Sequence, residues 1–255
     1  MTAAEKTELA RFLDLAGDVL SGGYSRGQPD YNFSDDPASN NSDNTIPLQP
    51  GLPPETQGQH SKLDIIAAEI QKCRACALCK TRTQAVPGQG VNNPLVMVIG
   101  KAPGIPEDSQ GHPFAGITGE RLDKMLASIG LSRNSNCFLS GITKCRTPDE
   151  REPLPEETIA CSSYLHREIQ ALHPKIILCA GRIAAQSLLR TTETTDTLRG
   201  TITKVRIADT VFPVIVSYHP DDLWENEELK RPAWEDLKKL KTWLDAHTQC
   251  RAEED

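Results

Sequence analysis

Strand-like and helix-like segments alternate from about residue 62 of this 255-residue chain, and this alternation constrains its fold more than any other feature. The apolar run from Leu95 to Ile99 is typical of a strand buried on both faces of a sheet. Alternation of this kind predicts an α/β three-layer sandwich with a central, mainly parallel four-stranded sheet. The predicted core strands are 95–99, 138–143, 176–179 and 211–216, with an edge strand at 201–207 and helices between them.

The first 60 residues differ from the rest in composition. Residues 1–21 carry apolar side chains at helical spacing, which predicts an N-terminal amphipathic helix. Residues 22–60 are rich in Pro, Asn and Ser and hold too few aliphatic residues to offset chain entropy, so we expect a linker. The folded domain is then expected at 61–250. The helix either packs on this domain or binds a protein partner.

The overall charge and hydropathy exclude some classes of protein. The net charge of −7 disfavours tight nonspecific DNA binding, because such binding depends on neutralising phosphates. A local basic groove remains compatible with it. No apolar run approaches the length of a transmembrane helix, and residues 1–6 lack the pattern of a signal peptide. We therefore expect no membrane contact and a cytoplasmic location, in which cysteines stay reduced.

Four cysteines have the spacing of a thiolate metal site. Cys73 and Cys76 form a Cys-x-x-Cys pair, and Cys145 and Cys161 follow as distant single residues. Thiolates suit zinc or iron–sulfur clusters. A zinc ribbon would carry a second Cys-x-x-Cys pair, so the spacing favours a [4Fe-4S] cluster over zinc.

The remaining cysteines fit this site less well. Cys79 could extend the first pair into a ferredoxin-like run, but the next cysteine and the proline that would complete that run are missing. We expect Cys79 to be a bystander or a reserve ligand. Cys137, Cys179 and Cys250 are expected to be structural, the first two in apolar strands.

Three loops follow predicted strands at the edge of the sheet where ligands bind, namely 100–104, 141–146 and 218–221. Together with the cysteines, the loops resemble the family 4 (iron–sulfur) uracil-DNA glycosylases over residues 62–246. The order and spacing of the motifs carry this resemblance. They are Cys73-x-x-Cys76, Arg82, Val86-Pro87-Gly88, Gly100-x-Ala102-Pro103-Gly104, Glu107-Asp108, Gly111-x-Pro113-Phe114-x-Gly116, Lys144-Cys145-Arg146, Pro153-Leu154-Pro155, Cys161, Arg199-Gly200 and His219-Pro220.

The resemblance implies roles for these residues. Phe114 would stack on an extruded base, and His219 would donate a hydrogen bond to the uracil carbonyl that gains charge as the glycosidic bond breaks. The base-binding loop would be formed by Gly100, Ala102, Pro103 and Gly104. A structural [4Fe-4S] cluster near the DNA-binding face would be held by Cys73, Cys76, Cys145 and Cys161.

Three positions depart from the pattern of the family. Lys101 stands where the family usually has an acid, which places positive charge beside a cationic sugar. Gly141 stands where an asparagine amide usually pairs with the uracil edge. Asp221 replaces a serine, and a carboxylate is expected to repel DNA phosphate.

These departures favour a divergent glycosylase-fold protein whose uracil excision is weak or lost. Such a protein would have a DNA-associated role as an accessory of replication or repair, with residues 1–60 recruiting a partner. The alternative is an active glycosylase of base excision repair, acting on uracil or a damaged base. In that case Ser140, Thr143 or Glu107 would compensate for the changes. A third hypothesis is an electron-transfer or redox-sensing iron–sulfur protein.

Overall fold

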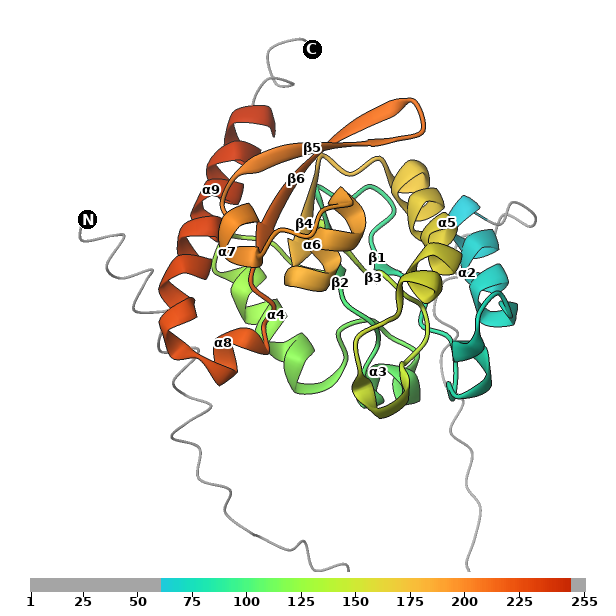
Figure 1. The fold of residues 1–255 in the computed structure, drawn as a ribbon. Helices are drawn as coiled ribbons and strands as arrows, with labels where there is room; N and C mark the ends of the chain where they lie inside the picture. Colours follow the sequence, from blue (N-terminus) through green and yellow to red (C-terminus); the bar gives the residue numbers. More distant parts are fainter. Residues whose placement is uncertain (1–60, 249–255) are drawn as a thin grey trace, which may run out of the picture.

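The computed structural model describes residues 61–248, which form a central sheet with helices on both faces (Figure 1). The predicted N-terminal helix (1–21), the linker (22–60) and the predicted domain end at 250 lie outside the described residues. Within 61–248, no helix combines the length and the apolar character needed to cross a membrane.

The sheet has a parallel core with an antiparallel strand at each edge. Its strands are β1 (Gln89–Gly90), β2 (Val96–Gly100), β3 (Cys137–Gly141), β4 (Ile176–Ala180), β5 (Ile202–Ile207) and β6 (Thr210–Ser217), in the order β1-β3-β2-β4-β6-β5. The central strands β3, β2, β4 and β6 are parallel, which confirms the predicted four-stranded core. β5 is antiparallel to β6 and forms the predicted edge, whereas the two-residue β1 was not predicted.

Helices cover both faces of this sheet (Figure 1). Their bounds are α2 (Lys62–Lys72), α3 (Ile105–Gln110), α4 (Gly116–Ala127), α5 (Pro155–Leu172), α6 (Arg182–Leu189), α7 (Thr195–Leu198), α8 (Asp222–Glu225) and α9 (Lys230–Thr248), with single-turn 3₁₀ helices at Ala77–Lys80, Pro148–Glu150 and Glu227–Leu229. Pro155 opens α5 and α6 follows Gly181, both as predicted. The helices α3, α7 and α8 were not predicted, because four to six residues are too few to show a helical period.

Alternate residues of the parallel strands face opposite layers, as the pleat of a strand requires. In β2, Val96 and Val98 belong to an apolar cluster with α4 and α9, whereas Met97 and Ile99 belong to a second cluster with α5 and α6. α2 lies outside α5, and its Ile70 is fully buried there. The sandwich therefore has the three predicted layers.

The parallel strands end at one common edge. β2 and β3 end at Gly100 and Gly141, which are paired in register, while β4 and β6 end at Ala180 and Ser217. The loops that leave this edge are the ones that the sequence singled out. The fold thus brings segments more than a hundred residues apart in the chain to one place.

Candidate functional site

Two connected hollows lie at this edge of the sheet. An inner cavity of about 120 Å³ is lined by the ends of β2 and β3, the Phe114 loop and the loop after β6. An outer cleft of about 660 Å³ extends from it toward α6 and α7. The predicted residues that line the inner cavity are Gly100, Lys101, Ala102, Pro103, Gly104, Phe114, Gly141, His219 and Asp221.

The ring of Phe114 forms one wall of the inner cavity. Its backbone has a φ of 51°, in the left-handed region that non-glycine residues rarely adopt. Arg133 stabilises this turn, because its Nη2 donates to the Phe114 carbonyl at 3.2 Å. The ring lies against Gly100, where an added Cβ would be 2.5 Å from Phe114 Cζ. A glycine at position 100 is therefore what allows the ring to occupy this place.

His219 is buried opposite Phe114, with the two rings stacked at 6.0 Å between centroids and 26° between planes. Its backbone N–H donates to the Asp222 carboxylate at 3.0 Å. Its Nδ1 lies 3.3 Å from both the backbone nitrogen and the carboxylate Oδ2 of Asp221. These contacts fix the ring through Nδ1, and within residues 61–248 no hydrogen bond occupies Nε2, which can then meet a ligand.

Lys101 and Asp221, two of the departures from the family pattern, form an ion pair. Lys101 Nζ lies 3.6 Å from Asp221 Oδ2, and Arg121 Nη1 lies 3.6 Å from Asp221 Oδ1. Thr118 Oγ1 donates to the same Oδ1 at 2.6 Å. Burial alone would raise the pKa of Asp221, but the contact with His219, the hydrogen bond from Thr118 and the charge of Lys101 hold that pKa well below its usual range.

This network changes the expectation for Asp221. The sequence predicted a carboxylate that repels phosphate, but two cations lie within salt-bridge distance of it. Thr118 and Arg121 were missed because they lie on α4, about a hundred residues away in the chain, and no motif marks them. Lys101 itself is half exposed and points along the mouth of the cavity toward Asp221.

Gly141 has no room for a side chain. A Cβ added there would lie 2.7 Å from the Lys101 carbonyl oxygen and 3.0 Å from the Thr143 carbonyl oxygen. Ile142 N donates to the Gly100 carbonyl at 3.0 Å, which ties the two strand ends together. The position that would carry an amide is thus closed by backbone.

The three residues expected to compensate for these changes are engaged in holding the loops. Ser140 Oγ donates to Glu168 at 2.8 Å within a buried pair of Glu168 with Lys144. Thr143 Oγ1 donates to the Cys145 carbonyl at 3.2 Å. The Glu107 carboxylate accepts from Gly104 N at 3.0 Å, and burial raises the pKa of this carboxyl.

The predicted cysteine ligands gather beside the pocket. Cys145 and Cys161 are buried, and Cys73 and Cys76 are partly buried. Cys145 is close enough to interact electrostatically with both Cys73 and Cys76, and Cys161 with Cys145 and Cys73. Arg82 Nη1 donates to Cys145 Sγ at 2.9 Å. A hydrogen bond with Cys73 raises the pKa of Tyr164 to about 12.

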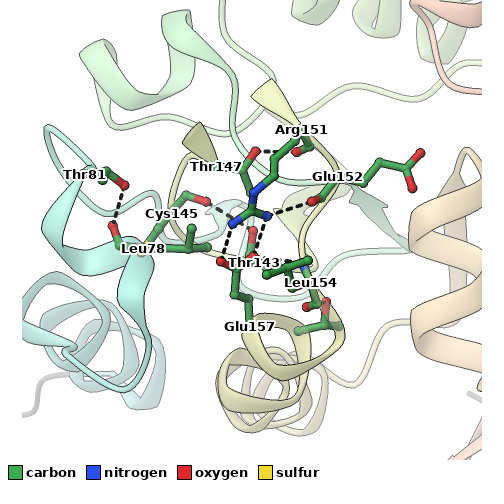
Figure 2. Close-up of polar contacts among 10 residues, drawn as sticks. Leu78, Thr81, Thr143, Cys145, Thr147, Arg151, Glu152, Leu154 and Glu157 are labelled. Carbon is green, nitrogen blue, oxygen red and sulfur yellow. Dashed lines mark hydrogen bonds and ion pairs between the residues drawn. The ribbon is translucent and has the colours of Figure 1, made fainter. Parts of the chain in front are cut away.

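The segment between β3 and α5 connects Thr143, which lines the inner cavity, to Cys145 (Figure 2). It starts directly after Gly141, the last residue of β3, and carries Thr143 and Cys145 before it reaches α5. Arg151 closes the segment through hydrogen bonds of 2.9 and 2.7 Å to the buried Glu157, which also accepts from Leu154 N at the start of α5 (Figure 2). A group bound by the cysteines would therefore hold the floor of the cavity against α5.

Cys137 and Cys179 are fully buried in β3 and β4, as expected for structural cysteines. Burial raises the pKa of each thiol to about 12. Cys79 lies near Arg82, and Cys250 lies outside the described residues. The assignment of Cys79 as a bystander stays a prediction.

Residues 87–238 match the family model of the uracil DNA glycosylase superfamily. The chain is 38% identical to a type-4 uracil-DNA glycosylase of Archaeoglobus fulgidus over 182 residues, which cover 70% of this chain and 91% of that protein. It is 37% identical to the type-4 enzyme of Saccharolobus solfataricus, with 71% and 86% covered. It is 32% identical to that of Thermotoga maritima, with 71% and 94% covered.

The lack of space for a side chain at position 141 can be tested by measuring the stability of a variant. We expect Gly141→Ala to lower the free energy of unfolding by about 1 to 3 kcal/mol, because its methyl group meets fixed backbone carbonyls. Gly104→Ala is a matched control in the facing loop, since its methyl group would meet the flexible ends of Glu107 and Glu150. Thermal denaturation of the two variants measures the difference. Equal midpoints would show that position 141 can accept a side chain.

Proposed function

Since the chain belongs to the type-4 family of the uracil-DNA glycosylase superfamily, we propose that it is a DNA glycosylase with weakened uracil excision. The single observation that carries this proposal is the closed backbone at Gly141, beside an otherwise intact Phe114 and His219. The closed backbone limits recognition of the base edge. Phe114 and His219 are the residues that act on the base and on the glycosidic bond.

In the proposed reaction one base leaves the DNA stack and enters the inner cavity, where Phe114 supports its face. The bond between the sugar C1′ and the base nitrogen breaks, and its electron pair leaves with the base. Nε2 of His219 would donate to the carbonyl oxygen that gains this charge, since Nδ1 accepts from the backbone N–H of Asp221. A water oxygen then bonds to C1′, and the proton that water loses balances the proton that the base gains.

Recognition of the base is the weak step of this scheme. A site that hydrogen-bonds a substrate group rejects analogues without that group by large factors. Here no side chain at position 141 reaches the base, and the nearby hydroxyls of Ser140 and Thr143 already donate to protein acceptors. Backbone groups of the Gly100–Gly104 loop are left to read the edge of the base.

A second candidate function is an accessory role in which DNA is bound but not processed. It is favoured by the closed backbone at Gly141, which would keep the edge of a bound base from being read. Such DNA binding would be weak. The cations in the described lining of the outer cleft, Lys101, Arg151 and Arg182, are each paired with a carboxylate, and paired cations neutralise DNA phosphates poorly. Recruitment of a protein partner by residues 1–60 belongs to this second proposal.

The two functions are separated by single-turnover release of uracil from single- and double-stranded oligonucleotides. We expect release by the wild-type protein at about a tenth or less of the rate of the Archaeoglobus fulgidus protein, since the amide is lost. His219→Ala should lower the remaining rate by about 10²-fold, because the oxyanion loses its donor. His247→Ala, an exposed histidine near the end of α9, is the matched control and should change nothing.

Two outcomes would count against this proposal. A wild-type rate equal to that of the relative would mean that base recognition is intact without the amide. DNA binding without any base release would favour the accessory role.

We also propose that Cys73, Cys76, Cys145 and Cys161 hold a [4Fe-4S] cluster that cross-links the loops and takes no part in breaking the bond. The donor set is thiolate throughout, which suits such a cluster. Among residues 61–248 no three metal-binding side chains lie close enough to share one ion.

The cluster should appear in the absorbance spectrum of anaerobically purified protein. We expect a broad visible band with about four irons per chain, as measured by colorimetric iron analysis. Cys145→Ser should lose most of the band and lower the thermal midpoint. Cys179→Ser should keep the band, because this buried cysteine lies in β4 within the core. One zinc per chain without visible absorbance would contradict the proposal.

A further inference from the structure

The inner cavity and the outer cleft share a short boundary. The sugar of an extruded nucleotide is expected at this boundary. The residues that line both hollows are Lys101, Ala102, Pro103, Gly104, Glu150, His219 and Asp221. A base in the inner cavity is joined by one bond to a sugar, and the rest of the strand must leave through the cleft. The sugar of the extruded nucleotide therefore lies at this boundary.

Breaking the glycosidic bond places positive charge on that sugar. Only two carboxylates of the described residues lie at the boundary, Glu150 and Asp221. Glu150 is exposed, and its carboxylate accepts from Ile105 N at 3.4 Å. Asp221 is partly buried and adjoins His219, the group that faces the departing base.

We propose that Asp221 is the carboxylate that stabilises the positive charge on the sugar while the glycosidic bond breaks, with Lys101 as its counterion. The inference rests on the proposed glycosylase function. It makes Lys101 and Asp221 one unit, in which the anion lies beside the buried histidine and the lysine lies on the solvent side. A cationic sugar can then approach Asp221 from the cavity.

The surroundings of Asp221 keep it charged and in place. Lys101 faces it from the loop after β2, Thr118 and Arg121 face it from α4, and His219 faces it from its own loop. The same hydrogen bonds and charges lower the pKa of this carboxyl, so it stays anionic at neutral pH and is a poor proton acceptor. Its contribution is therefore the electrostatic attraction of a fixed negative charge, and the proton of the attacking water leaves to solvent.

Binding of a cationic sugar analogue tests this role without requiring turnover. The probes are two oligonucleotides that differ at one abasic position, a positively charged pyrrolidine in one and an uncharged tetrahydrofuran in the other. We expect the wild-type protein to bind the pyrrolidine probe about tenfold or more tightly than the tetrahydrofuran probe. Asp221→Asn should remove this preference, Asp221→Glu should keep part of it, and Lys101→Met should increase it.

Asp209→Asn is the matched control, because this exposed aspartate lies in the turn between β5 and β6, at the opposite end of β6. It should bind both probes like the wild type. An unchanged preference in Asp221→Asn would overturn the inference, and so would equal binding of both probes by the wild type. Failure of the proposed function would instead appear as absent uracil release, which these binding ratios do not depend on.

The rate of base release is a second readout. It should change in the opposite direction if Asp221 only repels phosphate, which is the simpler interpretation. If Asp221 stabilises the sugar cation, Asp221→Asn slows single-turnover release about tenfold or more, while binding of uncleaved DNA stays equal or tightens. If Asp221 only repels phosphate, the same variant binds DNA more tightly and releases base at least as fast. That result would overturn the inference.

Discussion

The site depends on one backbone contact, the in-register pairing of Gly100 and Gly141 at the carboxyl ends of β2 and β3. Gly100 leaves space for the Phe114 ring, and Gly141 leaves space for the Lys101 carbonyl. Because both positions lack a side chain, the loops after the two strands can approach closely. The same approach that forms the cavity excludes an amide from its floor. Gly100 and Gly141 together thus determine both how a base stacks on Phe114 and how its edge is recognised.

Charge around the cavity is arranged in pairs. The lysine and the aspartate that depart from the family pattern looked like two independent losses in the sequence. In the structure they are partners, together with Arg121 and Thr118 of α4. Each change compensates for part of the other, since the aspartate balances the lysine charge and the lysine adds to the contacts with His219 and Thr118 that keep the carboxylate ionised. Only the change at Gly141 has no such partner.

Much of the fold could be predicted from the sequence. Apolar runs indicate buried strands, and the apolar period of the longer helices indicates which of their residues are buried. Val96 to Ile99 read as a strand buried on both faces and proved to be one. The short helix α8 and the two-residue β1 gave no period to recognise. The resemblance to the family also pointed to Phe114, Lys101, Gly141 and His219, and the structure brings these four to one cavity.

The parts of the site that the sequence could not show are contacts between distant segments. Thr118 and Arg121 meet Asp221 only because α4 packs beside the loop after β6. The lack of space at Gly141 depends on the direction of the Lys101 carbonyl, and this direction cannot be predicted from the residue types. Pairing of charges and closeness of backbone are properties of the folded chain, and they decide how departures from a motif should be interpreted.

The central claim is that the edge of the base is read without a side-chain amide. The most direct test is the affinity for oligonucleotides that carry 2′-fluorinated deoxyuridine or 2′-fluorinated deoxycytidine, neither of which is readily cleaved. The two bases differ in the groups that an amide would distinguish, so the account predicts affinities within about tenfold of each other. A preference for the uracil probe of about a hundredfold or more would contradict it.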